Sequence, residues 1–377
     1  MTVKTQKPFL MIPIKDRSFL KHTHVRRVIK YSTRKTIKQV VTNFFLIIFV
    51  ITLIGCTPRT QQIGKIKTVP QLFTDSYRTK DGIHLPYKQW GDADAPEAII
   101  IALHGFNDYS NAFKEFGPIA ACRNILTIAY DQRGFGNTPE KGIWAGTQFF
   151  VQDLLNLTHL LKEKYPNTPL FWMGESMGGA ISMIASKLID EHTLNGIILL
   201  APAVWGWRTM NPFQAGLLFM SAHVLPWMQL TGDGIPVKPS DNEKMLRELG
   251  ADPLVLKGAR IDSLYGLVSL MDDASVAAQH IKHPTLFLYG AKDELVPKHP
   301  TRETLRRLPR APIGKWDTIY YKNGYHMLIR DIKGEKVIKD ILAWINKEPY
   351  PSFLNEENEI LCFSATLQGD IPPLRKD

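Results

Sequence analysis

The sequence has few cysteines and no pattern that indicates a metal site. Only three of its 377 residues are cysteine, at positions 56, 122 and 362. There is no CxxC pair and no cluster of histidine and cysteine of the kind that binds zinc. If Cys56 is modified, as argued below, Cys122 and Cys362 are the only pair left for a disulfide. We expect both to be buried free thiols, and we predict no metal.

The main part of the chain also lacks an excess of positive charge. The formal net charge is +10, but residues 1–39 hold 11 of the 46 basic residues and only one of the 36 acidic ones. Residues 40–377 are therefore balanced, and they offer no basic surface of the kind that binds nucleic acid. We expect no nucleic-acid partner.

The basic leader is followed by an uncharged apolar run over residues 40–54, which ends in Gly55-Cys56. This order is typical of a secretory signal, and the run is shorter than the ~20 residues of a membrane span. Residues 53–56 resemble the bacterial lipobox, which implies a lipidated Cys56 and removal of everything before it. Thr57, where inner-membrane lipoproteins typically carry aspartate, favours the outer membrane of a bacterial envelope. An uncleaved anchor is the alternative; either would attach the chain to a membrane.

The pattern Gly174-x-Ser176-x-Gly178 lies between a short apolar run that ends at Met173 and a helical pattern over residues 180–189. It is the nucleophile-elbow pattern, a strained strand-to-helix turn with an exposed serine at its apex. Because the turn opens a helix, its backbone N–H groups favour a developing oxyanion. We predict that Ser176 is a catalytic nucleophile.

Buried strands alternate with helices along the rest of the chain, which predicts a mostly parallel sheet with helices on both faces. The alternation stops over residues 204–280, which are rich in Trp, Phe, Leu and Met and contain Pro and Gly. We expect short, broken helices there, forming a cap inserted into the sheet domain. Its apolar side chains either line a channel for an acyl chain or only pack the cap onto the sheet. Expected strands span residues 97–103, 125–130, 170–173, 196–200, 285–289 and 316–321; expected helices span 111–121, 147–164, 301–308 and 332–346.

A serine nucleophile needs a base, and the base needs an orienting carboxylate. In a parallel sheet both belong on loops after the strands. Asp293 follows strand 285–289 and His326 follows strand 316–321, so the order is Ser176, Asp293, His326. Glu294 is the alternative acid. Other histidines lie closer to the acid in sequence but fit the carboxyl end of the sheet less well: His280, His283 and His299.

The oxyanion hole requires two backbone donors. One should be the N–H of Met177, directly after the nucleophile, and the other should come from the loop after strand 97–103. Phe106 is the candidate because Gly105 lets the backbone turn inward. His104 is then expected to hold that loop rather than to act as a second base.

Five motifs together resemble the monoacylglycerol lipase and lysophospholipase branch of the serine α/β-hydrolases. They are HGFNDYS (104–110), DQRGFG (131–136), GESMGG (174–179), GAKDELVP (290–297) and NGYHMLIRD (323–331). The resemblance implies the α/β-hydrolase fold, a serine triad, no cofactor and hydrolysis of an ester through an acyl-enzyme. The expected organisation is a leader (1–55), a tether (56–71), a hydrolase core (72–203 and 281–347), a cap (204–280) and a tail without chemistry (348–377).

The expected function is therefore a membrane-attached serine esterase that takes a single-chain lipid ester, such as a monoacylglycerol or a lysophospholipid. Two other functions stay open. An aminopeptidase or amidase on the same fold would need a cap acid to hold the substrate amine, and Asp262, Asp272 and Asp273 are candidates. The motif DQRGFG also resembles proline iminopeptidases, although those carry tryptophan where this chain has Met177. The third function is a non-catalytic lipoprotein that binds lipid or a partner. Oligomeric state and chain-length preference are not predicted.

Overall fold

The computed structural model describes residues 36–46, 57–62, 64, 67–232, 237–351 and 361–364. The chain forms two compact units, Met1–Gly55 and Cys56–Asp377. In the first unit, residues 36–46 form a helix with exposed side chains. Cys56 and residues 47–55 of the apolar run lie outside the described residues. No helix in the described part of the chain has both the length and the apolar character needed to cross a membrane. The rest of this section concerns the second unit.

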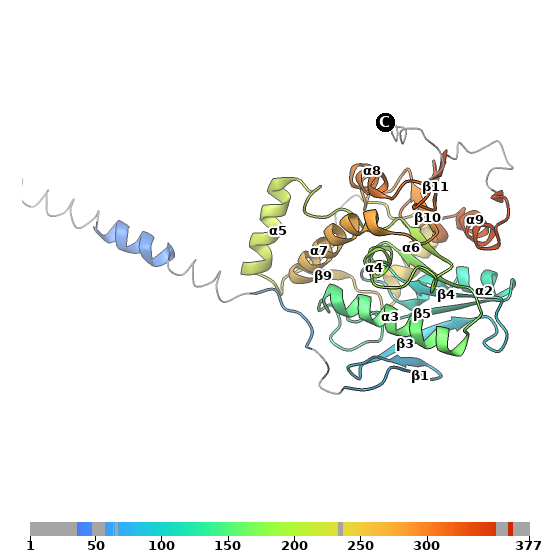
Figure 1. Ribbon diagram of the computed structural model, residues 1–377. Coiled ribbons are helices and arrows are strands. Elements are labelled where there is room, and N and C mark those ends of the chain that lie inside the picture. The colour runs from blue at the N-terminus through green and yellow to red at the C-terminus, as the bar shows by residue number, and fades with distance from the viewer. Residues whose placement is uncertain are drawn as a thin grey trace, which may run out of the picture. The chain divides into compact units, whose positions relative to one another are not determined.

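A ten-stranded sheet forms the centre of this unit, in the order β1-β2-β3-β5-β4-β6-β7-β10-β11-β12. The six strands from β5 to β11 in that order pair in parallel, and the outer strands pair antiparallel (Figure 1). The predicted α/β class with a mostly parallel sheet is confirmed. The strands are β1 (Gln71–Leu72), β2 (Ser76–Arg78), β3 (His84–Trp90), β4 (Ala98–Leu103), β5 (Ile125–Tyr130), β6 (Leu170–Glu175), β7 (Gly196–Leu200), β10 (Thr285–Gly290), β11 (Trp316–Tyr321) and β12 (Leu361–Ser364).

Helices cover both faces of the sheet. Successive side chains of a strand point to opposite faces, so each central strand contributes to two hydrophobic clusters. In β4, Ile99 and Ile101 belong to one hydrophobic cluster, and Ile100 and Ala102 belong to another. A strand buried on both sides is largely apolar, which is why β4 is a continuous apolar run and Thr127 is the one polar residue of the described strand β5. The first cluster includes residues of α3 (Thr147–Lys164), α4 (Met177–Ala185), α7 (Ile261–Ala277) and α8 (Lys298–Arg307). The second includes residues of α2 (Phe116–Ala121) and α9 (Gly334–Asn346) (Figure 1).

One predicted helix is divided in two. Instead of a single helix over residues 111–121, the chain forms a short 3₁₀ turn, η1 (Ser110–Phe113), and then α2. Pro118 lies inside the predicted span. Its missing N–H and its ring prevent a helix from running through it without a break, so the second helix begins only two residues before it. Cys122 follows α2 and is a free thiol, but it is exposed, so the expectation of a buried Cys122 is wrong. The side chain of Cys362 lies outside the described residues.

The stretch between β7 and β10 contains both long and short elements. The expectation of short, broken helices is wrong for α7, which has 17 residues, no proline and several buried side chains against the core. Trp205 and Trp207 also pack against the core. The elements are α5 (Pro212–Val224), β8 (Gln229–Thr231), α6 (Glu243–Ala251), β9 (Gly258–Arg260), α7 and η2 (Ala278–His280).

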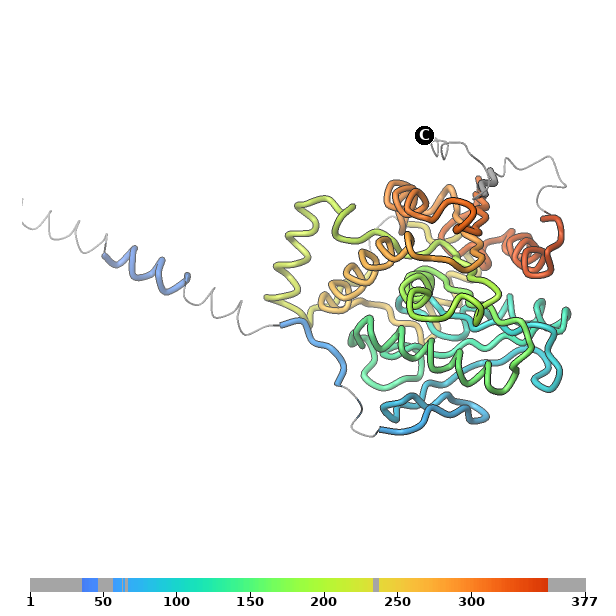
Figure 2. Tube along the Cα trace, viewed as in Figure 1, coloured from blue at the N-terminus to red at the C-terminus, as the bar shows by residue number. Residues whose placement is uncertain are grey.

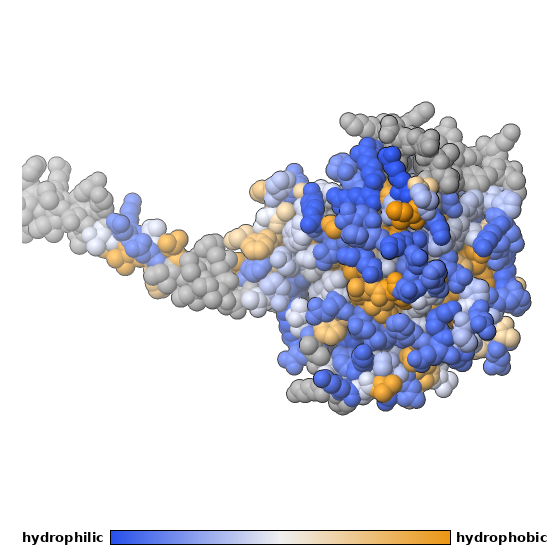
Figure 3. All heavy atoms as spheres, viewed as in Figure 1, coloured by the Kyte–Doolittle hydropathy of each residue, from blue (hydrophilic) through white to orange (hydrophobic). Residues whose placement is uncertain are grey.

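The apolar side chains of α5 behave differently from those of α7. Only Ala222 of α5 is buried, and Phe213 is 79% exposed. Leu218 packs against the core and Phe219 contacts Tyr265 of α7, but most of the large apolar side chains of α5 remain exposed. The face drawn in Figure 3 is mainly hydrophilic, with apolar side chains gathered in separate patches. Exposed apolar residues of α5 and the segment after it are Phe213, Leu217, Phe219, Met220, Leu225, Trp227, Met228 and Leu230.

The described residues before β1 are attached to the body rather than free of it. The N–H of Gln61 donates to the carbonyl oxygen of Trp144 at 2.9 Å, and the N–H of Arg59 donates to Asp262 at the start of α7 at 3.3 Å. Figure 2 traces this segment, in blue, alongside the body. An extended segment has unpaired backbone groups, and here the body supplies their partners. The polar composition of the predicted tether gave no sign of these contacts.

Candidate active site

Ser176 lies at a sharp turn between β6 and α4. Its φ of 52° and ψ of −112° are values that residues other than glycine rarely adopt. A Cβ atom at position 178 would lie 2.2 Å from the carbonyl oxygen of Leu103, and one at Gly174 would lie 2.4 Å from the backbone of Gly178. Only glycine fits at these two positions, so strand and helix can approach closely and hold Ser176, half-buried, at the N-terminus of α4.

The loops after β10 and β11 bring Asp293 and His326 together. Nδ1 of His326 lies 2.8 Å from Oδ2 of Asp293, and both side chains are buried. The other carboxylate oxygen of Asp293 accepts the N–H groups of Leu295 and Val296, at 2.8 and 2.9 Å. Asp293 accepts these three hydrogen bonds, so it fixes the imidazole with the Nδ1 proton toward itself.

The alternatives to Asp293 and His326 have other contacts. Oε2 of Glu294 accepts the backbone N–H of Lys238 at 2.7 Å. This carboxylate therefore contacts the cap and not His326. Nε2 of His283 lies 3.3 Å from the carbonyl oxygen of Asp190, before β10 begins. His283 is therefore at the amino end of the strand, opposite to Asp293. These contacts favour Asp293 and His326 as the acid and the base.

The environment of His326 favours its protonated form. Burial by itself lowers the pKa of the imidazole, but the charge and hydrogen bond of Asp293, with the charge of Glu175, outweigh this and raise the pKa above its ordinary value. Arg330 acts in the opposite direction. A base with a raised pKa accepts the serine proton more readily, but it requires a higher pH to be neutral beforehand.

The loop after β4 lies directly beside the serine. A Cβ atom at Gly105 would lie 3.4 Å from Cβ of Ser176 and 4.0 Å from its Oγ. Asn107 has a φ of 67°, so the loop bends sharply after Phe106. The loop that carries Phe106 thus lies beside the nucleophile elbow, and the N–H groups of Phe106 and Met177 stay the candidate oxyanion donors.

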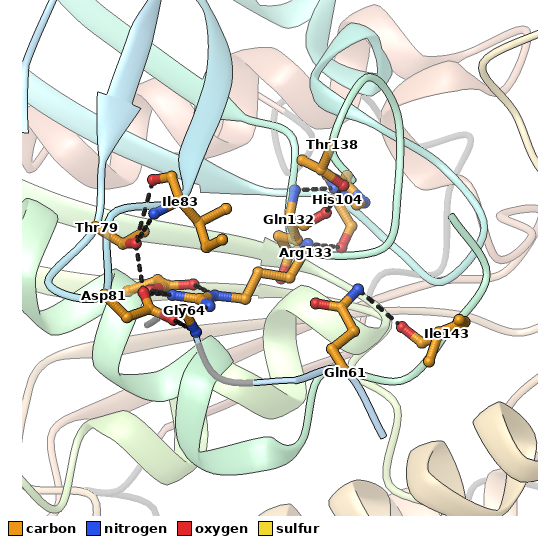
Figure 4. Close-up of polar contacts among 11 residues, drawn as sticks. Gln61, Gly64, Thr79, Asp81, Ile83, His104, Gln132, Arg133, Thr138 and Ile143 are labelled. Carbon is orange, nitrogen blue, oxygen red and sulfur yellow. Dashed lines mark hydrogen bonds and ion pairs between the residues drawn. The ribbon is translucent and has the colours of Figure 1, made fainter. Parts of the chain in front are cut away.

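His104 has the structural contacts that we expected of it. The N–H of Gln132 donates to Nε2 of His104 at 2.9 Å, so the ring is the tautomer with hydrogen on Nδ1, which donates to the carbonyl oxygen of Gly105 at 2.8 Å. Figure 4 shows His104 and Gln132 facing one another. Burial lowers the pKa of His104, which keeps the ring neutral. Its hydrogen bonds connect the loops after β4 and β5.

An ion pair that the sequence analysis did not identify connects the serine and histidine loops. The guanidinium of Arg330 contacts Glu175 at 2.8 Å and Asp108 at 2.6 Å. Glu175 directly precedes Ser176. The signal available in the sequence was that Asp108, Glu175 and Arg330 are charged residues in motifs next to buried apolar strands. Buried charges are rarely left unpaired, so such residues are candidates for pairing with one another.

Residues 239–240, within the cap, are hydrogen-bonded to the loop that carries His326. The hydroxyl of Ser240 donates to Asp331 at 2.6 Å, and the N–H of Tyr325 donates to the other oxygen of Asp331 at 2.8 Å. The N–H of Met327 donates to the carbonyl oxygen of Pro239 at 3.0 Å. The residues on either side of His326 are therefore held by contacts that involve residues 239–240 within the cap.

The cavity on the other side of this loop does not include the triad. It has a volume of about 260 Å³, and its lining includes Tyr321, Gly324 and Leu328 together with four lysines, Lys292, Lys322, Lys333 and Lys336. Within the described ranges, no group of three or more His, Cys, Asp or Glu side chains is arranged to bind a metal ion.

Comparison with protein families gives one match that covers most of the core. The model of the family described as serine aminopeptidase, S33 matches residues 94–333. Among individual proteins, the monoglyceride lipase of Rattus norvegicus is 26% identical over 297 residues, which cover 76% of this chain and 93% of that protein. The monoacylglycerol lipase of Mycolicibacterium smegmatis is 23% identical over 279 residues, covering 72% and 95%.

Solved structures show the same fold. A soluble variant of the monoglyceride lipase from Saccharomyces cerevisiae superimposes with a TM-score of 0.59 at 20% identity, covering 77% of this chain and 98% of that one. The monoacylglycerol lipase of Paleococcus ferrophilus has a TM-score of 0.57 at 21% identity, covering 70% and 98%. The predicted α/β-hydrolase fold and the resemblance to the monoacylglycerol lipase branch are confirmed.

Proposed function

This chain belongs to the α/β-hydrolase family described as serine aminopeptidase, S33, and we propose that it is a membrane-attached serine hydrolase that cleaves carboxylic esters of single-chain lipids. The observation that carries the proposal is the buried contact of 2.8 Å between His326 and Asp293, on loops that are linked to the Ser176 elbow. This arrangement of acid, base and strained serine is the one that nucleophilic acyl transfer requires.

The reaction proceeds in two halves. Neutral His326 accepts the proton of Ser176 as Oγ attacks the ester carbonyl carbon, while the N–H groups of Phe106 and Met177 donate to the oxyanion. Collapse of this intermediate expels the alcohol, which takes the proton from the imidazolium, and leaves an acyl-enzyme. Water then attacks the acyl carbon with His326 again as the base, releasing the fatty acid and free Ser176. Asp293 stabilises the imidazolium in both halves.

Two observations support a lipid ester as the substrate. Several relatives that cover most of this chain are named monoglyceride or monoacylglycerol lipases. In addition, α5 and the segment after it expose several large apolar side chains, including Phe213 and Trp227. An apolar surface on the cap suits a substrate delivered from a lipid phase better than a freely soluble one.

Attachment to a bacterial envelope membrane, with the outer membrane favoured, is part of the proposal. It rests on the basic leader, the apolar run and the lipobox-like ending at Cys56. The test is to express the full chain in a Gram-negative host and compare it with Cys56→Ser. A fatty-acid label and recovery in the outer-membrane fraction, both lost in the variant, would support lipidation. An unlabelled chain that stays in the membrane would indicate the uncleaved anchor.

The family description makes an aminopeptidase the second candidate, but the cap acids do not favour it. Asp262 already accepts two hydrogen bonds from the guanidinium of Arg260. Asp272 is paired with the guanidinium of Arg208. An acid that holds a substrate amine must have its charge available, so among the three candidates Asp273 fits this role best.

The deciding experiment is hydrolysis of a substrate panel by the full-length chain, with Ser176→Ala as the matched control. The panel contains monoacylglycerols, lysophospholipids, short p-nitrophenyl esters and a prolyl amide, together with a fluorophosphonate that labels active serines. Turnover of the long single-chain esters that disappears in the control is the expected result. Turnover of the amide alone would favour the peptidase. If the chain shows no turnover of any substrate and no labelling by the fluorophosphonate, a non-catalytic lipid-binding protein would be favoured.

A further inference from the structure

Arg330 lies between the buried carboxylates of Asp108 and Glu175, beside the proposed active site. Its side chain is 4% exposed, and those of Asp108 and Glu175 are 7% and 2% exposed. Each terminal nitrogen of the guanidinium contacts a different carboxylate, NH1 at 2.6 Å from Asp108 and NH2 at 2.8 Å from Glu175. Such an arrangement is costly to bury unless the geometry is good, and it holds all three groups in fixed orientations.

The three residues come from the three loops on which the reaction depends. Glu175 is the last residue of β6, next to Ser176. Asp108 follows the loop of Phe106 and begins the turn that η1 continues. Arg330 ends a short 3₁₀ turn, η3 (Leu328–Arg330), directly after His326. One side chain therefore links the nucleophile, the base and one oxyanion donor.

The two carboxylates are not equivalent with respect to the base. The groups that act most strongly on His326 are Asp293 from the loop after β10, Glu175 from β6 and Arg330 from η3. Glu175 directly precedes Ser176, whereas Asp108 lies on the loop after β4, two residues beyond Phe106. The hydroxyl of Ser176 does not titrate in the working range. The charge of Glu175 favours the imidazolium, and that of Arg330 opposes it.

We propose that Arg330 is a positioning residue of the reaction, which holds the three loops in their working arrangement. Glu175, unlike Asp108, sets the pH range in which His326 can accept the serine proton. The inference rests on the proposed serine mechanism. It assigns to the residue before the nucleophile an electrostatic role in catalysis. If the cluster were only a structural ion pair, the two carboxylates would be interchangeable in their effect on the base.

Glu175→Gln and Asp108→Asn form a matched pair, because each replaces a carboxylate on the same guanidinium by a neutral amide of the same size. Arg330→Lys keeps the charge but, as a single ammonium, cannot contact both carboxylates in the same way. Arg330→Met removes the charge. The full-length chain is used throughout, and thermal unfolding establishes that each variant is folded. The pKa of His326 is read by NMR of ¹³C-labelled histidine, assigned with His326→Gln, and the pH dependence of kcat/KM is measured on a short p-nitrophenyl ester.

The expected result has an order. Glu175→Gln lowers the pKa of His326 by roughly half a unit or more, so the acidic limb of kcat/KM moves to lower pH by the same amount. Asp108→Asn leaves the limb close to that of the wild type. Arg330→Met moves it to higher pH. Arg330→Lys keeps the limb but lowers kcat at least about tenfold with little change in KM, because the loops are less well held while the charge remains.

Equal shifts in Glu175→Gln and Asp108→Asn, or no shift in either, would overturn the proposal, as would full kcat in Arg330→Lys. If Arg330→Met does not fold, the two amide variants still decide, since they keep the arginine contacts. The NMR titration needs no turnover. A wild-type chain that hydrolyses no ester would therefore contradict the proposed function, while the order of His326 pKa values would still test the electrostatic part of the inference.

Discussion

Two buried arginines in this chain have the same chemistry and different surroundings. Arg133, in the loop after β5, contacts Asp81 and Asp153 at 2.6 Å each. Arg330, in the loop after β11, contacts Asp108 and Glu175. The partners of Arg133 lie in the β2-β3 turn and in α3, and Figure 4 shows Arg133 reaching the Asp81 side of this network.

The difference between the two networks is the position of their carboxylates. Asp81 also accepts from Thr79 and Gly64, so the Arg133 network holds the hairpin and the segment before β1 against the core. Glu175 adjoins Ser176, so the Arg330 network acts on the reacting groups. The same ion pairing stabilises the fold in one place and orients the candidate site in the other. The predictions below test whether this contrast is correct, beginning with the largest expected effect.

The contrast requires Asp293 and His326 to be the reacting pair near Arg330. Asp293→Asn should lower kcat/KM by about 10³–10⁴-fold, because the amide no longer stabilises the imidazolium or selects the working tautomer. Glu294→Gln, its neighbour, should retain activity within about threefold, since its carboxylate contacts Lys238 instead. Hydrolysis of a short ester measures both. A large loss in Glu294→Gln with a small one in Asp293→Asn would reverse the assignment of the acid.

Removal of either arginine should destabilise the fold to a similar extent but change activity differently. Arg330→Met leaves two buried carboxylates without their partner, and Arg133→Met leaves buried Asp153 and half-buried Asp81 without theirs, which costs about 3–5 kcal/mol of unfolding free energy in each case. Denaturant unfolding measures this cost. If both variants are folded under the assay conditions, only Arg330→Met should change the pH dependence of ester hydrolysis. An identical change in Arg133→Met would mean that general loosening of the core explains both.

The elbow that the Arg330 network holds should tolerate no side chain at its glycines. Gly178→Ala places a methyl group 2.2 Å from a backbone oxygen of β4, and we expect a loss of about 1–3 kcal/mol together with most activity. Gly216→Ala in the exposed helix α5 is the matched control. No atom lies within 4 Å of the added Cβ there, so it should stabilise the chain by up to about 1 kcal/mol. Thermal unfolding compares the two, and a neutral Gly178→Ala would show that strand and helix can separate.

The smallest expected effect concerns Asp331, next to Arg330. Burial, opposed by hydrogen bonds from Ser240 and Tyr325, raises the pKa of Asp331 to about 6. A carboxyl whose pKa is higher in the folded state than in the unfolded one binds its proton preferentially when folded. Its contribution to stability therefore increases as the pH falls through 6 toward the unfolded value near 4.

Wild type should consequently gain about 1 kcal/mol relative to Asp331→Asn when the pH is lowered from 7 to 5. Unfolding by urea at several pH values provides the measurement. Parallel stability curves for the two proteins would contradict the raised pKa.

Much of the core could be predicted because local and global requirements agree there. Strands 125–130 and 316–321 and helix 147–164 have the predicted boundaries. A core strand is rich in apolar and aromatic residues and a helix on a sheet is amphipathic, so each pattern appears within one short window. Pro118 indicates the division of helix 111–121, which the helical spacing of the apolar residues does not show.

The Arg330 network and the surroundings of α5 could not be predicted in the same way. Arg330 and Asp108 are separated by 222 positions, and no local pattern relates them. The apolar residues of α5 suggested packing or a channel, whereas the structure exposes them. Hydrophobic composition predicts that a segment needs an apolar partner, but not whether that partner lies within the same chain.

The sequence by itself determined the alternation of strands and helices, the elbow around Ser176 and the positions of Asp293 and His326 after their strands. These depend on the conformation of a few consecutive residues and on the order of elements along the chain. Only the tertiary structure decided which charges meet, which apolar side chains stay in water and how residues 57–62 are held. Those properties depend on distances between segments far apart in sequence, and packing of the whole sheet domain sets such distances.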